Sequence, residues 1–225
     1  MAIPRCLLFD CDGTLVDSEP LLAAEMAVSL NEVGLPFSPS DYMGEFRGAR
    51  FKHIVAELQR RHGSIDEALL KVHEQEMRQK LAQRLESELQ PLPGVREALD
   101  ALVHYPRGVV SNGPEKKIRT GLSVTGLLDD FGDNLFSGYT ANCWKPDPRL
   151  YLYAARAMGY HPSECVAIDD ALVGVKAALA AGMTVIHLNR FPDVEETPEG
   201  AITISNMYQL PTVVGHMVLG EALAN

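Results

Sequence analysis

The sequence predicts an α/β fold: a doubly wound, mostly parallel sheet with a Rossmann-like core, interrupted by an inserted α-helical domain. Three observations lead to this prediction. Short continuous apolar runs, typical of strands buried on both faces, alternate with helix-length segments in the second half of the chain. Strands that alternate with helices form right-handed βαβ units. The first apolar run, however, is separated from the second by far more chain than one such crossover needs.

Five strands are expected, each a short apolar run. They cover residues 6–9, the surroundings of 109–110, 135–136, 166–168 and 184–188. Two helices between the later strands, at 148–158 and 171–181, stop at Gly159 and Gly182. Glycine is favoured directly after a helix because it adopts the left-handed conformation that closes the last turn. The second half of the chain therefore follows a βαβ rhythm.

Residues 18–88 are expected to form a helical cap domain, which leaves 1–17 and 89–225 as the α/β core. Apolar side chains recur at helical spacing in three stretches of this insertion. The third stretch follows Ser64 and Glu67, whose spacing is that of a capping box, and predicts a long helix. The three apolar faces consist of Leu22, Met26, Leu30 and Val33; of Phe51, Ile54, Val55 and Leu58; and of Leu70, His73, Met77, Leu81 and Leu85.

Net charge limits the partners that the chain can take. Its 225 residues carry a formal charge of −10, which repels nucleic acid and anionic membranes at long range. No apolar run approaches the ~20 residues that span a bilayer, and the first residues do not resemble a secretory signal. The four cysteines form no Cys-x-x-Cys pair. We therefore expect a cytoplasmic protein with reduced thiols, no nucleic-acid or membrane partner, and no obligate protein partner.

The strongest signal is Asp10-Cys11-Asp12-Gly13-Thr14, directly after the first strand. Alternate residues of an extended chain share a face about 6.5 Å apart, so both carboxylates point the same way. Open α/β sheets bind their ligands at this carboxyl end of the strands. Gly13 permits a sharp turn, and Thr14 offers a hydroxyl and an N–H to a phosphate. A plain Asp-Gly turn needs one aspartate only, and two adjacent like charges are unfavourable without a cation.

Two later strand ends also carry polar groups. Ser111-Asn112-Gly113 can bind an anion through a hydroxyl and backbone N–H groups, although such a turn as often only ends a strand and has no binding role. Lys145 is braced by two prolines just past a strand and can lie beside Asp10, or it is a surface lysine in a rigid loop.

The fourth polar strand end is Asp169-Asp170, which follows a buried strand. Paired carboxylates suit a hard cation such as Mg²⁺. Alternatively, Asp170 is a helix N-cap with an acidic neighbour. Each strand end has an unremarkable reading by itself, but their coincidence at one sheet edge favours a functional site.

These segments resemble, in order, the four motifs of the haloacid-dehalogenase-like hydrolase superfamily. The resemblance covers essentially the whole chain, including a helical cap between the first and second motifs. The matching segments are residues 10–18, Ser111-Asn112-Gly113, Lys145-Pro146 and Asp169-Asp170, and the core segments 111–114, 135–139 and 144–148 look like bacterial 6-phosphogluconate phosphatases.

The resemblance implies a Mg²⁺-dependent phosphatase of a small phosphorylated metabolite. The implied substrate is a sugar phosphate or a phosphorylated sugar acid such as 6-phosphogluconate, and the implied intermediate is an aspartyl-phosphate. Asp10 would be the nucleophile and Asp12 the acid–base, while Ser111 and Lys145 would contact the phosphoryl oxygens.

The metal ligands implied by the resemblance are Asp10, the backbone carbonyl of Asp12, and Asp170, with Asp169 close behind. Because residues 169 and 170 are both aspartates, it stays open which of the two is the direct ligand. In the cap, Arg47 and Arg50 flank a glycine and can bind an anionic group distal to the phosphate, or lie in a solvated loop.

Two other functions stay open. A phosphosugar mutase would use the same intermediate and return the phosphoryl group to the substrate. A receiver-type signalling domain would also combine aspartates, Mg²⁺ and a lysine. In such domains these residues come in another order, and a long helical insertion after the first strand is absent.

Overall fold

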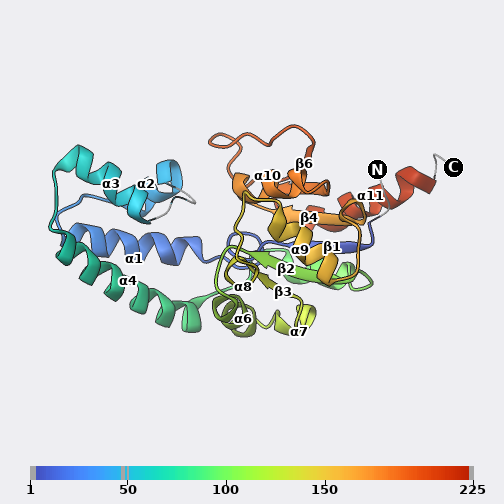
Figure 1. The fold of residues 1–225 in the computed structure, drawn as a ribbon, viewed down its shortest axis with the longest axis horizontal. Helices are drawn as coiled ribbons and strands as arrows, with labels where there is room; N and C mark the ends of the chain where they lie inside the picture. Colours follow the sequence, from blue (N-terminus) through green and yellow to red (C-terminus); the bar gives the residue numbers. More distant parts are fainter. Residues whose placement is uncertain (1–3, 47–48, 50, 223–225) are drawn as a thin grey trace. The chain divides into compact units, whose positions relative to one another are not determined.

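Two units make up the structure, a computed structural model that describes residues 4–46, 49 and 51–222. Unit 1 comprises Met1–Asp17 and Gln90–Asn225, and unit 2 comprises Ser18–Leu89. Figure 1 labels most of the strands and helices of the two units. Each unit has its own buried apolar core, so each is described by itself.

Unit 1 is built on a six-stranded sheet of order β3-β2-β1-β4-β5-β6 with parallel neighbours throughout. β1 lies in the centre, where the strand order reverses, and all four of its residues are buried. This parallel sheet confirms the predicted fold class. The strands are β1 (Cys6–Phe9), β2 (Arg107–Ser111), β3 (Leu135–Ser137), β4 (Cys165–Asp169), β5 (Thr184–Leu188) and β6 (Ala201–Ile204).

Helices cover both faces of this sheet. On one face, α9 (Arg149–Ala157) and α10 (Leu172–Ala180) belong to the same buried cluster as Leu8 of β1. On the other face, Phe9 meets Phe131 of α7 (Leu128–Phe131) edge-on, with ring centroids 5.8 Å apart. The other helices of unit 1 are α5 (Val95–Ala101), α6 (Glu115–Val124), α8 (Gly138–Ala141) and α11 (Leu210–Ala222), with short 3-10 helices at Pro162–Glu164 and Met207–Gln209.

The sequence does not predict β6, so five strands were too few. β6 is an edge strand, and three of its four residues are only partly buried or exposed. Such a strand lacks the fully buried apolar run that marks the central strands. By contrast, α9 and α10 fall within the predicted ranges 148–158 and 171–181.

Unit 2 is built from α1 (Glu19–Glu32), α2 (Pro39–Asp41), a π-helical turn at Tyr42–Phe46, α3 (Phe51–His62) and α4 (Glu67–Glu88). The predicted apolar faces meet in its core. Met77 is the buried centre of the α4 stripe, whose other predicted members are half-buried. The capping-box prediction at Ser64 and Glu67 is wrong: Asp66 caps α4, and its carboxylate accepts the Leu69 N–H at 2.9 Å.

All four cysteines are buried, and none of them takes part in a disulfide bond in the structure. Within the described residues, no helix combines the length and the apolarity that a membrane crossing requires.

Candidate active site

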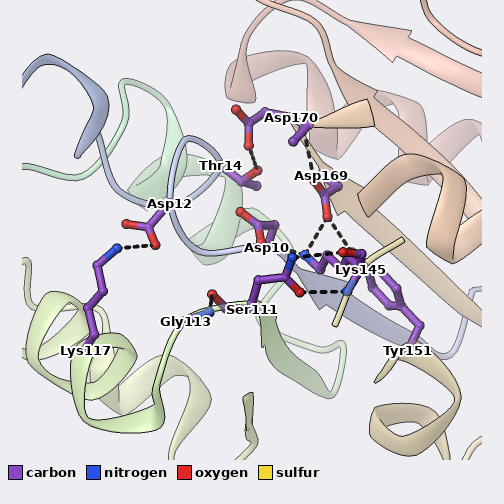
Figure 2. A network of polar contacts seen from close by, with 12 residues as sticks. Asp10, Asp12, Thr14, Ser111, Gly113, Lys117, Lys145, Tyr151, Asp169 and Asp170 are labelled. Atoms are coloured by element: carbon purple, nitrogen blue, oxygen red, sulfur yellow. Dashed lines mark hydrogen bonds and ion pairs between the residues drawn. The ribbon is translucent and has the colours of Figure 1, made fainter. Parts of the chain in front are cut away.

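The carboxyl edge of the sheet gathers the polar side chains that follow its central strands (Figure 2). β2 and β4 flank β1. β1 ends at Phe9, β2 ends at Ser111 and β4 ends at Asp169. Because parallel strands present the same ends at one edge, Asp10, Ser111 and Asp169 come close together. Lys145 joins them from the loop between α8 and α9.

Lys145 makes two ion pairs within this group. Its Nζ lies 2.6 Å from Asp10 Oδ1 and 2.7 Å from Asp169 Oδ2, and all three side chains are buried. Burial acts against the charged ammonium, yet Asp10 and Asp169 raise the pKa of Lys145 well above its ordinary range. Lys145 is therefore a fixed cation beside Asp10 and not a surface lysine.

Asn112 braces the backbone that carries Lys145. Its Oδ1 accepts the Lys145 N–H at 2.7 Å, and its Nδ2 donates to the Lys145 carbonyl at 3.2 Å. The sequence suggested Asn112 as an anion contact. Both ends of its side-chain amide join the turn after β2 to the Lys145 loop.

Asp169 accepts three hydrogen bonds from the protein. Its Oδ2 accepts from Lys145 and, at 2.7 Å, from the hydroxyl of Tyr151 in α9, while its Oδ1 accepts the Ala171 N–H at 3.0 Å. Burial and the nearby Asp169 carboxylate raise the pKa of Tyr151 well above its ordinary value, so the phenol keeps the proton that it donates. This role could not be predicted from the sequence, in which Tyr151 is one of several apolar residues of a predicted helix.

Asp170 faces the turn that follows Asp10. Its Oδ1 accepts a hydrogen bond from the Thr14 hydroxyl at 3.0 Å. Gly13 has a φ of +87°, and a Cβ at that position would lie 2.3 Å from Asp170 Oδ2. Glycine is therefore required at position 13 both for its backbone conformation and for the close approach of Asp170.

Three carboxylates converge at this edge. Asp10, Asp169 and Asp170 each offer an oxygen within 4.8 Å of the others. Burial raises the pKa of Asp10 to about 7, and Asp169 and Asp12 act in the same direction, although Lys145 opposes them. Buried carboxylates in such a group favour a bound cation, and an all-oxygen donor set suits a hard divalent ion. The cluster is compatible with a divalent metal site.

Ser111 and Gly113 form a tight turn after β2. The Ser111 hydroxyl oxygen accepts the Gly113 N–H at 3.0 Å, and the Gly113 carbonyl accepts the Ser137 hydroxyl at 2.6 Å. A hydroxyl that accepts one hydrogen bond can still donate its own hydrogen. Ser111 can thus donate to an oxygen bound beside Asp10.

Asp12 pairs with a lysine that no sequence motif includes. Lys117 of α6 donates from Nζ to Asp12 Oδ2 at 2.7 Å (Figure 2). Burial opposes its charge, but Asp12 raises the pKa of Lys117. Nothing in the sequence separates Lys117 from Lys116, because only the rotation of the helix decides which of them reaches Asp12. Arg47 and Arg50, predicted to bind substrate, lie outside the described residues.

Comparison with known proteins identifies the family to which the chain belongs. A family model described as haloacid dehalogenase-like hydrolase matches residues 4–182. The 6-phosphogluconate phosphatase of Escherichia coli K12 is 33% identical over 209 residues, which is 92% of this chain and 93% of that protein. Hexitol phosphatase B of the same organism is 30% identical and covers 98% of this chain and 100% of its own length. The chain belongs to the haloacid dehalogenase-like hydrolase family.

Solved structures agree with this assignment. A haloacid dehalogenase-like protein of Agrobacterium tumefaciens superposes with a TM-score of 0.83 at 30% identity, covering 95% of this chain and 99% of that chain. A family hydrolase of Deinococcus radiodurans, solved with bound phosphate and sodium, superposes with a TM-score of 0.81 at 26% identity and covers 97% and 98%.

The family match and the phosphatases among its relatives define the enzyme class as phosphoric monoester hydrolase. The predicted membership of the superfamily is confirmed. A receiver-type signalling domain does not fit this family.

Proposed function

We propose that the chain hydrolyses a small phosphorylated metabolite with Mg²⁺ as its cofactor and Asp10 as the nucleophile. The observation that carries this proposal is the Lys145 ammonium 2.6 Å from the buried Asp10, at the edge where Asp169 and Asp170 also converge. A thiol nucleophile is a poor alternative, because burial and the neighbouring Asp12 raise the pKa of Cys11 well above its ordinary value.

Asp10 and Asp170 are the carboxylates that we propose as direct metal ligands, with the backbone carbonyl of Asp12 beside them and Asp169 behind. The three hydrogen bonds accepted by the oxygens of Asp169 support Asp170 as the direct ligand. When bound, Mg²⁺ would offset the repulsion between the Asp10 carboxylate and the phosphate dianion.

In the first step, an oxygen of Asp10 forms a bond to phosphorus while the bond between phosphorus and the ester oxygen breaks. Asp12 gives a proton to the departing alkoxide. Lys145 and the Ser111 hydroxyl donate to the phosphoryl oxygens, which carry the charge during transfer.

In the second step, Asp12 takes a proton from a water molecule as the water oxygen bonds to phosphorus. The bond from phosphorus to Asp10 breaks, inorganic phosphate leaves and the Asp10 carboxylate is restored. Asp12 thus returns to the protonated state that the next cycle requires.

A sugar phosphate or a phosphorylated sugar acid such as 6-phosphogluconate is the substrate class that we propose. The two Escherichia coli relatives, named for a phosphorylated sugar acid and for hexitols, support it. We further propose that unit 2 acts as a cap that selects the substrate, with Arg47 and Arg50 as ligands for its distal anionic group.

A phosphate-release screen tests this function. Purified protein is offered phosphorylated sugars, sugar acids and nucleotides, with Mg²⁺ and with EDTA. We expect Mg²⁺-dependent release that is highest for sugars or sugar acids. It should be lost in Asp10→Asn and kept in Asp133→Asn, a matched change at a side chain that is 97% exposed.

Mass spectrometry of acid-quenched protein should find the phosphoryl group on the peptide that contains Asp10. Substantial Mg²⁺-dependent activity in Asp10→Asn would refute the nucleophile. An isomerised substrate without release of phosphate would identify a mutase instead.

A further inference from the structure

Tyr151, which no predicted motif includes, contacts both of the charged side chains behind Asp10. Its hydroxyl donates to Asp169 Oδ2 at 2.7 Å, and its ring centroid lies 5.1 Å from Lys145 Nζ. Lys145 donates to the same oxygen of Asp169, also at 2.7 Å. Figure 2 shows Tyr151 on the side of Lys145 and Asp169. One buried side chain therefore touches a cation and its counter-ion together.

The surroundings hold the Asp169 carboxylate in one orientation. Its Oδ1 accepts the Ala171 N–H, while Oδ2 accepts from Tyr151 and Lys145. On the side of α10, a Cβ at Gly174 would lie only 1.8 Å from Oδ2. The Asp169 carboxylate therefore packs directly against the helix at Gly174, in the place that a larger side chain would fill. The Tyr151 hydroxyl fixes the oxygen that Lys145 also uses.

We propose that Tyr151 is a positioning residue for Lys145, which it aims at the phosphoryl group through Asp169 and through its own ring. This inference rests on the proposed function, in which Lys145 donates to the phosphoryl oxygens. A lysine has a flexible four-carbon stem, and a buried ammonium needs well-placed partners. Tyr151 supplies a fixed counter-ion and an aromatic face, which attracts a cation.

The same helix provides a matched control. Tyr153, two residues along α9, is 43% exposed, and its ring packs edge-on against Phe136 at 5.8 Å. Tyr153→Phe removes the same hydroxyl from the same helix but away from the charged cluster. Tyr151→Phe keeps the ring beneath Lys145 and removes only the hydrogen bond to Asp169.

Tyr151→Phe should lower kcat/KM for a sugar phosphate about 10-fold, mainly through kcat, because Lys145 would no longer be held in register with the phosphoryl oxygens. The dissociation constant of orthovanadate, measured calorimetrically with Mg²⁺ present, should rise in the same proportion because vanadate mimics the transferring phosphoryl group. Tyr153→Phe should change neither value. Circular dichroism and thermal unfolding establish that each variant is folded.

A double-mutant cycle asks whether Tyr151 acts through Lys145. In a Lys145→Met background, Tyr151→Phe should cause no further loss of vanadate affinity, because the group that it positions is gone. Vanadate binding can be measured even where turnover is too slow to detect.

Distinct outcomes overturn distinct parts of this reasoning. Parent-like kcat/KM and vanadate affinity in folded Tyr151→Phe would show that the hydroxyl is only structural. An equal further loss in the Lys145→Met background would show that Tyr151 acts independently of Lys145. An unchanged kcat/KM in Lys145→Met itself would instead contradict the role of Lys145 in the proposed function.

Discussion

Replacing Gly13 with alanine probes how closely the turn after β1 is built against the acidic pair after β4. An added Cβ would lie 2.3 Å from Asp170 Oδ2 and 2.8 Å from its Cγ. This approach is about 1 Å inside ordinary van der Waals contact. The Asp170 carboxylate must then move and lose the 3.0 Å hydrogen bond from Thr14.

The structure sets the size of the effect. Loss of a hydrogen bond to a charged group accounts for roughly 1.5–3 kcal/mol, and alanine at a positive φ adds about 1–2 kcal/mol. We therefore expect Gly13→Ala to lower the free energy of unfolding by about 2.5–5 kcal/mol. Gly182 is the matched control, because it has a φ of +76° and a Cβ there would meet nothing within 4 Å. Gly182→Ala should lose only the backbone part, about 1–2 kcal/mol.

Two assays separate the backbone effect from the effect on Asp170. Urea unfolding measures the stability of both variants against the parent. If Asp170 is a metal ligand as proposed, the Mg²⁺ concentration for half-maximal phosphate release should rise about 10-fold or more in Gly13→Ala. It should stay unchanged in Gly182→Ala. Equal stability losses in the two variants, together with an unchanged Mg²⁺ requirement in Gly13→Ala, would refute this placement of Asp170.

Three further predictions follow from the site. In a urea titration, Lys145→Met should lower the free energy of unfolding by about 3–5 kcal/mol, because it leaves buried carboxylates without their cation. Lys117→Met removes a partly exposed ion pair and should lower the free energy of unfolding by less than about 1 kcal/mol. Asp12→Asn should reduce kcat/KM about 10²–10⁴-fold for a sugar phosphate but far less for p-nitrophenyl phosphate, whose leaving group needs no proton; equal losses would contradict the acid role. Mg²⁺ should raise the melting temperature of the parent but not of Asp170→Asn, and an equal rise in both would exclude Asp170 as a ligand.

The meeting of Asp10, Ser111 and Asp169 could be predicted because it depends on a general property of parallel sheets. The end of each strand is visible in the sequence as the point where an apolar run gives way to polar residues. Parallel pairing then brings those ends to one edge, whatever the details of packing. The sheet class and the central strands could be predicted for the same reason.

The partners of these residues could not be predicted in the same way. Lys117 and Tyr151 reach the site from helices, and the rotation of a helix on its sheet is decided by packing over the whole core. Tyr151 belongs to the predicted helix at 148–158, but a helix prediction cannot show which acceptor its hydroxyl finds. Likewise, Asn112 lies at a predicted strand end, yet its amide turns to the Lys145 backbone, which is distant in the sequence.

The two aspartates differ in their surroundings as their proposed roles require. A nucleophile works best when it is held still and shielded from water, and the Asp10 side chain is 13% exposed beside a Lys145 that is 3% exposed. An acid–base must exchange protons with the leaving group and then with water, and the Asp12 side chain is 33% exposed beside a Lys117 that is 45% exposed. Asp10 and Asp12 are only two residues apart, yet the Asp10 carboxylate is largely shielded from solvent and the Asp12 carboxylate is accessible to it. Each carboxylate pairs with a different lysine. Exchanging the two roles would place the bond-forming carboxylate in water and the proton carrier where water cannot easily reach it.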